Sequence, residues 1–129
     1  MFLFIFDNVS VLIVVIALPL ELHLLLGRHL LLAGLSEPVQ GFAALSGVPG
    51  ELDAIESMYG GEVLLNQAFT EEEFELKLEE ERPGIVHLAS HAEFTGDPET
   101  SFVLTFDGRL SMDELSQLLR SGRYGEQPV

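Results

Sequence analysis

The chain has 129 residues, 47% of them hydrophobic, with 21 acidic and 6 basic side chains and no cysteine. A formal net charge of -15 excludes the basic footprint with which proteins bind nucleic-acid phosphates. Without cysteine, the chain forms no disulfide and no thiolate zinc site, and it has no cysteine nucleophile. The length predicts a single domain with one core.

The first thirty residues differ in composition from the rest of the chain. Up to residue 35 only three side chains are charged, namely Asp7, Glu21 and Arg28, so almost the whole acidic excess lies further along. We therefore divide the chain into a hydrophobic segment, residues 1–30, and a domain, residues 31–129.

Three interpretations apply to the hydrophobic segment. A secretory signal would need positive charge before its apolar run, but Asp7 is the first charge. A transmembrane helix needs about 20 apolar residues. The run at residues 9–20 has only 12 and is broken by Pro19. Buried strands of a sheet covered on both faces also form continuous apolar runs. We favour this interpretation for residues 30–35 and, less strongly, for residues 2–20.

A loop, a helix and a short strand are expected next. Residues 36–50 are rich in glycine and proline and predict the loop. Pro49 suits a first helical turn, and the residues after it predict an amphipathic helix that Gly60 and Gly61 end. The strand is predicted at residues 62–69. Helical spacing assigns four residues of the helix to the core: Leu52, Ile55, Met58 and Tyr59.

Two capping boxes mark the starts of two further helices. Thr70 and Glu73 have the S/T-x-x-E spacing, and so do Ser111 and Glu114. Core positions are expected at Phe74, Leu76 and Leu78 of the first helix, which Pro83 and Gly84 end, and at Leu115, Leu118 and Leu119 of the second.

A strand and a hairpin lie between these two helices. Residues 85–89 form an apolar run that predicts a strand buried on both faces, and the pair Asp107 and Gly108 predicts the tight turn of a β-hairpin. The complete order is strand, helix, strand, helix, strand, hairpin, helix. This order predicts an α/β fold with a mostly parallel sheet and helices on both faces.

Four histidines are the candidate chemical groups. His23 and His29 lie among leucines, and we interpret them as packing or surface residues. His87 lies inside the predicted strand, where a polar neighbour is expected to satisfy it. His91 follows the carboxyl end of that strand, where α/β sheets place their sites. An imidazole there acts as a general base when a nucleophile lies within reach.

Other kinds of site find no support in the sequence. His87 and His91 would be roughly 13 Å apart along a strand, which is too far to share a metal ion. No glycine-rich motif predicts a phosphate-binding loop. Ser90 and His91 point to opposite faces of the strand, so they cannot form a nucleophile–base pair. We therefore predict neither a metal nor a cofactor.

Three blocks of the sequence resemble the first part of a CHAT domain, a caspase-like module that in bacteria, especially cyanobacteria, often follows tetratricopeptide (TPR) repeats. The blocks are LLAGLSEPVQGF, ELDAIESMYGGEVLLNQAFT and IVHLASHAEFTGDPETSFVLTFDGRLSMDEL. They agree with the family in content, order and spacing. The resemblance implies a three-layer caspase-haemoglobinase-type α/β sheet and kinship with cysteine peptidases of the caspase and separase group.

The same resemblance implies roles for individual residues. His91 falls on the catalytic base, the histidine of the family's (S/T)-H-G segment. Ala92 replaces the glycine whose backbone amide helps to hold the oxyanion. The family's nucleophile is a cysteine in an L-S-A-C-E-T-like segment on the next strand, whereas this chain stops at Val129 without one. Because a base with no thiolate cannot perform this chemistry, we expect no peptidase activity from the chain alone.

The missing strand has a structural consequence as well. We expect a sheet that is incomplete at the C-terminus, with an unpaired strand edge that favours self-association. Two functions remain open. In the first, the chain supplies His91 to a protein partner that carries the cysteine strand or TPR repeats. In the second, it is a non-catalytic α/β interaction module or a truncated remnant. We favour a cytoplasmic location, with membrane association through residues 1–30 as the alternative.

Overall fold

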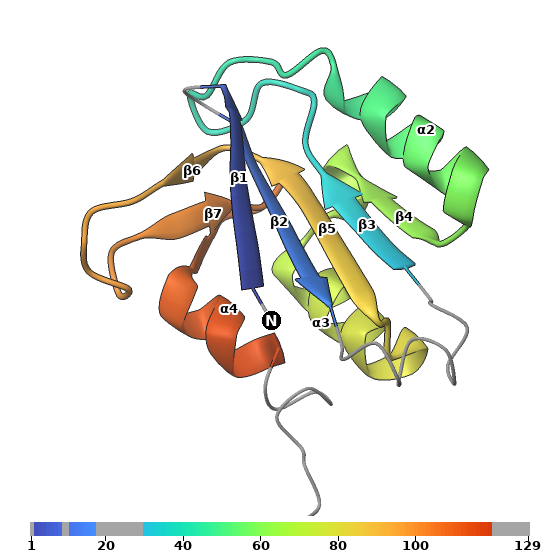
Figure 1. Ribbon diagram of the computed structural model, residues 1–129. Helices are drawn as coiled ribbons and strands as arrows, with labels where there is room; N and C mark the ends of the chain where they lie inside the picture. The colour runs from blue at the N-terminus through green and yellow to red at the C-terminus, as the bar shows by residue number, and fades with distance from the viewer. Residues whose placement is uncertain (1, 9–10, 18–29, 120–129) are drawn as a thin grey trace, which may run out of the picture.

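The structure, a computed structural model, describes residues 2–8, 11–17 and 30–119 (Figure 1). In chain order its elements are β1 (Phe2–Asn8), β2 (Val11–Ala17), β3 (Leu30–Gly34), α2 (Val48–Tyr59), β4 (Glu62–Leu65), the 3-10 helix η1 (Asn66–Ala68), α3 (Glu71–Glu81), β5 (Ile85–Ser90), β6 (Ala92–Glu93), β7 (Phe102–Leu104), β8 (Arg109–Ser111) and α4 (Met112–Leu119).

The main sheet has five strands in the order β1-β2-β5-β3-β4. β3 lies between β4 and β5 and is parallel to both. β2 runs antiparallel to β5, and β1 runs antiparallel to β2 (Figure 1). A second, antiparallel sheet has the order β6-β7-β8. The predicted α/β class is therefore confirmed, with a parallel centre to which the first two strands add an antiparallel hairpin.

Helices cover both faces of the main sheet, as predicted. Successive side chains of β3 point to opposite faces. Leu30 and Leu32 pack in one core cluster with Val48 and Leu52 of α2. The other face holds the larger cluster, to which α3, α4 and the second sheet contribute. Its fully buried members include Leu31, Ala33, Phe74, Leu78, Val86, Leu88, Val103, Leu104, Leu110, Leu115 and Leu119.

Local signals in the sequence place the starts of α3 and α4 and the turn before α4. The Thr70 hydroxyl accepts a hydrogen bond from the Glu73 amide at 3.1 Å. The Ser111 hydroxyl accepts from the Glu114 amide, and the Glu114 carboxylate accepts from the Ser111 amide, each at 3.0 Å. The predicted hairpin turn also forms, because the Thr105 amide donates to the carbonyl oxygen of Gly108 at 2.9 Å.

Three residues predicted to be in the core are exposed. Met58 and Tyr59 are 70% and 61% exposed, because the buried residues of α2 lie in its first half and its last turn extends beyond the core. Leu76 is 41% exposed. It lies two positions from Phe74 and from Leu78, and two positions correspond to about 200° around a helix, so it cannot share their face.

The strand predicted for residues 62–69 is shorter than expected. β4 ends at Leu65, and η1 follows it. The cause is the backbone of Asn66, whose φ of 56° is left-handed and ends the extended conformation. Asparagine tolerates this region better than most residues because its short polar side chain can form local hydrogen bonds.

The sheet pairing places a strand of the N-terminal segment beside β5, and the self-association expected from an open edge stays a prediction. β2 pairs with β5 along its whole length, from Ala17 opposite Ile85 to Leu12 opposite Ser90. The edge of β5 that faces away from β3 is therefore occupied by this chain's own hairpin. Within the described part of the chain, none of the helices has the length and apolar content to cross a bilayer.

Candidate active site

The last residues of β5 direct their side chains alternately to the two faces of the sheet. His87 and Ala89 lie on the face covered by α2, and Ala89 belongs to the α2 cluster. Ser90 is fully buried on the other side, where its hydroxyl donates to the carbonyl oxygen of Leu104 at 2.7 Å. The Ser90 hydroxyl is thus hydrogen-bonded to Leu104, which agrees with the prediction that it does not pair with His91.

His91 lies directly after β5 and is nearly buried, with 4% of its surface exposed. Its Nε2 atom is 2.8 Å from the carbonyl oxygen of Ala43. Its ring centroid lies 4.9 Å from that of Phe42, with the planes tilted by 42°. Its own carbonyl oxygen accepts a hydrogen bond from the Leu104 amide at 2.9 Å, which fixes the backbone at this point.

The contact with Ala43 determines the protonation pattern of the imidazole. A carbonyl oxygen only accepts hydrogen bonds, so Nε2 must carry the hydrogen. In the neutral ring the other nitrogen, Nδ1, then holds the lone pair that can take up a proton. A backbone carbonyl therefore sets the orientation and the tautomer of the His91 ring, leaving Nδ1 as the nitrogen without a hydrogen.

The carbonyl of Ala43 belongs to the loop between β3 and α2, and two long-range anchors hold that loop. Asn66 accepts from the amides of Ser36 and Glu37 at 2.8 and 3.1 Å, and its own amide group donates to the Ser36 hydroxyl at 2.9 Å. The side chain of Gln40 donates to two carbonyl oxygens of the hairpin turn, those of Thr105 and Gly108, each at 3.1 Å.

Sequence reasoning missed these anchors, which hold the loop that carries the Ala43 carbonyl. Asn66 and Gln40 both have left-handed backbones, with φ of 56° and 52°. Asn66 carried a usable signal, because an asparagine at the end of a short apolar run is a common choice for such a backbone. Gln40 carried none, and Ala43 acts through its backbone, which no residue type reveals.

His87 behaves as the sequence predicted. Its Nε2 atom lies 2.8 Å from a carboxylate oxygen of Glu51 on α2, and the two side chains are 12% and 26% exposed. The pair joins β5 to the helix that covers it. No group of three or more metal-ligating side chains gathers among the residues that the structure describes. His23 and His29 lie outside those residues.

Ala92 begins β6 and lies opposite Val103 of β7. The role in oxyanion binding that the resemblance implies for its amide stays a prediction.

Comparison with known proteins adds one finding. The family model described as the CHAT domain matches residues 14–123, a range that contains β3 to β8, the described helices α2, α3 and α4, and His91. No curated protein and no solved structure matches the chain. The division at residues 30/31 stays a prediction, because the match begins within β2. Since the match covers most of its length, the chain belongs to the CHAT domain family.

Proposed function

We propose that this chain provides the base of a caspase-like cysteine-peptidase site and has no peptidase activity by itself. The observation that carries the proposal is the 2.8 Å contact between Nε2 of His91 and the carbonyl oxygen of Ala43. It leaves Nδ1 as the basic nitrogen, which is the state a general base requires before it takes a proton from a thiol.

The nucleophile has to come from outside these 129 residues, because they contain no cysteine. The attacking species in such enzymes is a thiolate, and neither a serine nor a water molecule replaces it in this chemistry. Ser90, the hydroxyl adjacent to His91, is buried and donates to Leu104 instead. A cysteine-bearing strand of the kind that the family resemblance implies would therefore be the partner of this chain.

A second candidate, a non-catalytic interaction module, is favoured by a different observation. β2 already pairs with the edge of β5, so another strand gains that edge only when the hairpin of β1 and β2 leaves it. If the hairpin stays, the hydrogen bond of His91 serves structure alone by attaching the β3–α2 loop to the end of β5.

The two functions differ in what they predict for the reactivity of an added thiol. The test mixes the chain with a synthetic peptide that contains L-S-A-C-E-T after an apolar lead, and measures alkylation of its cysteine by iodoacetamide at pH 6.5. A base next to the thiol increases the thiolate fraction and so accelerates alkylation. The first function predicts acceleration by the wild-type chain and none by His91→Gln, whose amide can still donate to the Ala43 carbonyl.

The matched control is His87→Gln, which alters the histidine of β5 that contacts Glu51 instead. It should accelerate alkylation as well as the wild type does. Equal rates with wild type, His91→Gln and no protein would reject the first function and support the interaction module. Cleavage of denatured casein by the chain alone would contradict both, since both predict an inactive chain.

A further inference from the structure

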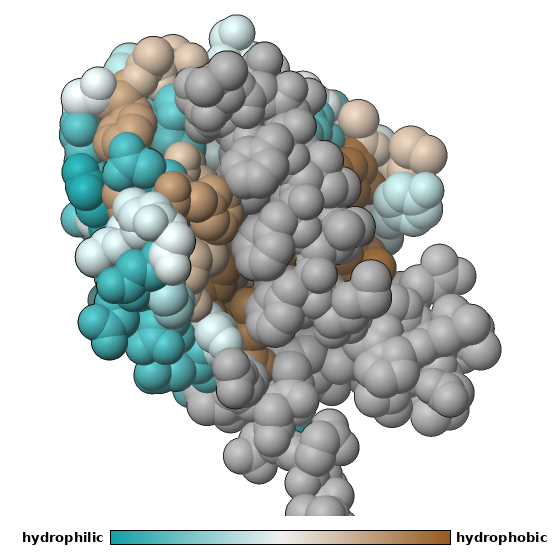
Figure 2. Space-filling view, turned by 60° about the vertical axis from the view of Figure 1, so that its left-hand side comes forward, coloured by the Kyte–Doolittle hydropathy of each residue, from teal (hydrophilic) through white to brown (hydrophobic). Residues whose placement is uncertain are grey.

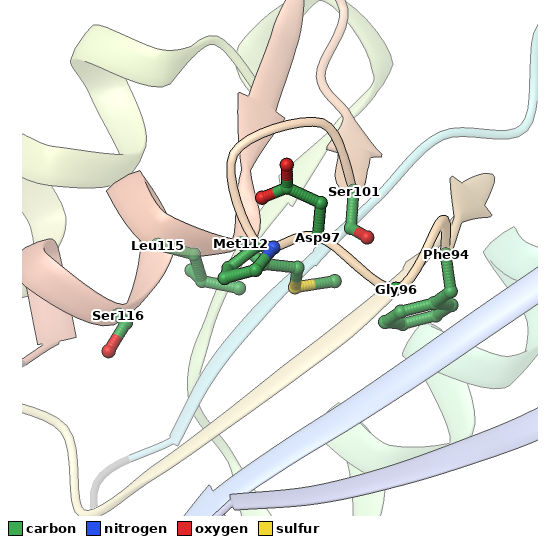
Figure 3. Close-up of a pocket in the computed structure, with 8 residues that line it drawn as sticks. Phe94, Gly96, Asp97, Ser101, Met112, Leu115 and Ser116 are labelled. Carbon is green, nitrogen blue, oxygen red and sulfur yellow. The ribbon is translucent and has the colours of Figure 1, made fainter.

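A hollow of about 420 Å³ lies apart from His91, between the loop that follows β6 and the beginning of α4. In Figure 3 the loop with Gly96 and Asp97 arches over it, Phe94 stands on one side, and Met112 and Leu115 approach from α4. Its volume lies within the range of pockets that bind small ligands or single side chains.

The walls of the hollow are held in place by backbone hydrogen bonds. The Met112 amide donates to the carbonyl oxygen of Ser101 at 2.8 Å, and the Asp113 amide donates to that of Pro98 at 3.1 Å. Both bonds join the loop to the first turn of α4. The hollow is thus built between two fixed segments.

The lining of the hollow is mainly apolar, and the Phe94 side of it is accessible to solvent. Phe94 is 44% exposed, although it directly follows the short strand β6. Met112, Pro98 and Leu115 add further apolar surface. On the face drawn in Figure 2, hydrophobic residues in brown adjoin hydrophilic ones in teal. Exposed apolar surface bordered by polar residues is typical of an interaction site.

Acidic residues line the hollow or adjoin its lining residues in the chain. Asp97 lines it, and three further exposed carboxylates lie close to its lining residues in the chain: Glu93, Glu99 and Asp113. Glu99 is held near Asp97, because its amide donates to the Asp97 carboxylate at 2.9 Å. The chain as a whole also carries a net charge of -15. Such a field attracts basic partners and repels acidic ones.

We propose that this hollow binds a peptide segment that places one large apolar side chain next to lysine or arginine residues. The apolar side chain would fill the space between Phe94 and Met112, and the cations would face Asp97 and its neighbours. Burial of the apolar group supplies affinity, and the charges supply selection against acidic segments. The proposal does not involve His91, so it holds whether or not the chain takes part in peptidase chemistry.

The probe is a labelled pentapeptide with one phenylalanine between two pairs of lysines, capped at both ends. Binding to the full chain is followed by ¹⁵N NMR titration, which locates the site from the shifted amides. We expect the shifts to concentrate in residues 94–101 and 112–116. A peptide with serine in place of phenylalanine should bind at least about tenfold more weakly, as should one with glutamates in place of lysines.

Two variants, each matched with a remote control, test the surface itself. Phe94→Ala should weaken binding about tenfold, while Tyr59→Ala, which truncates an exposed aromatic ring on α2, should not change it. Asp97→Asn should weaken binding about threefold, whereas Asp53→Asn on α2 should not. The asparagine retains the oxygen that accepts from Glu99.

Three results would overturn the proposal. They are equal binding of the serine peptide, shifts outside the two segments, and an effect of either remote control as large as that of its partner variant.

Discussion

Asn66 offers the clearest test of how the loop that carries the Ala43 carbonyl is held. Its side chain forms hydrogen bonds with two amides and one hydroxyl of residues 36 and 37, thirty positions earlier in the chain. Its backbone has a φ of 56°. Replacing it therefore removes three hydrogen bonds and, for most residues, adds the steric cost of a left-handed backbone.

The magnitudes of these two effects can be separated. A hydrogen bond contributes about 1 kcal/mol net, and the bond to Glu37 contributes less because water reaches that residue. A left-handed backbone costs alanine about 1 kcal/mol more than glycine. We therefore expect Asn66→Ala to lower the free energy of unfolding by about 3 kcal/mol and Asn66→Gly by about 2. Asn66→Asp keeps the acceptor oxygens and should lose at most about 1 kcal/mol.

The assay is urea unfolding followed by far-ultraviolet circular dichroism, since the chain has no tryptophan. The expected order of stability is wild type, Asn66→Asp, Asn66→Gly, Asn66→Ala. A glycine variant no more stable than the alanine variant would refute the backbone part of the reasoning. An aspartate variant as unstable as the alanine variant would refute the part based on the acceptor oxygens. If the alanine variant does not fold, the aspartate and glycine variants still test the hydrogen bonds.

Two further predictions concern packing and charge. A Cβ atom on Gly34 would lie 2.7 Å from the Ala89 carbonyl oxygen. Gly34→Ala should therefore lower the free energy of unfolding, measured in urea, by about 1–3 kcal/mol. The control Gly50→Ala should not lower it, because the space around Gly50 is open. Burial, and then repulsion from carboxylates including Glu114, raise the pKa of Glu71. Its carboxylate thus lowers stability above the raised pKa, and this penalty is relieved as the pH falls through it. Titration of the Glu71 carboxyl by ¹³C NMR should give a midpoint above that of an exposed glutamate. Glu114→Gln should lower this midpoint. An unchanged midpoint would refute the contribution of Glu114 to the raised pKa of Glu71.

The parts of the fold that sequence reasoning predicted are those set by neighbouring residues. The capping of α3 by Thr70 and of α4 by Ser111 depends on groups three positions apart, and both are present. The hairpin turn at Asp107 and Gly108 is equally local. Alternation along a strand likewise separated Ser90 from His91, because successive side chains must point to opposite faces.

The parts that it did not predict depend on contacts between distant segments. The antiparallel pairing of β2 with β5 joins residues that lie far apart in the chain, and no local pattern in the sequence predicted it. The strand predicted to reach Phe69 ends at Leu65, because Asn66 has a left-handed backbone, and its side chain bonds with the loop after β3. His91 was a candidate from its position alone, but its partner is a backbone carbonyl 48 positions away.

The proposed function requires that the carbonyl of Ala43 hold His91 in one tautomer, with Nδ1 free to act as the base. The direct measurement is a long-range ¹H–¹⁵N correlation spectrum of the histidine rings at pH 8, in which the signals of His91 are identified by their loss in His91→Gln. The account predicts a protonated Nε2 and an unprotonated Nδ1. A hydrogen on Nδ1, or the averaged pattern of a freely exchanging imidazole, would contradict it.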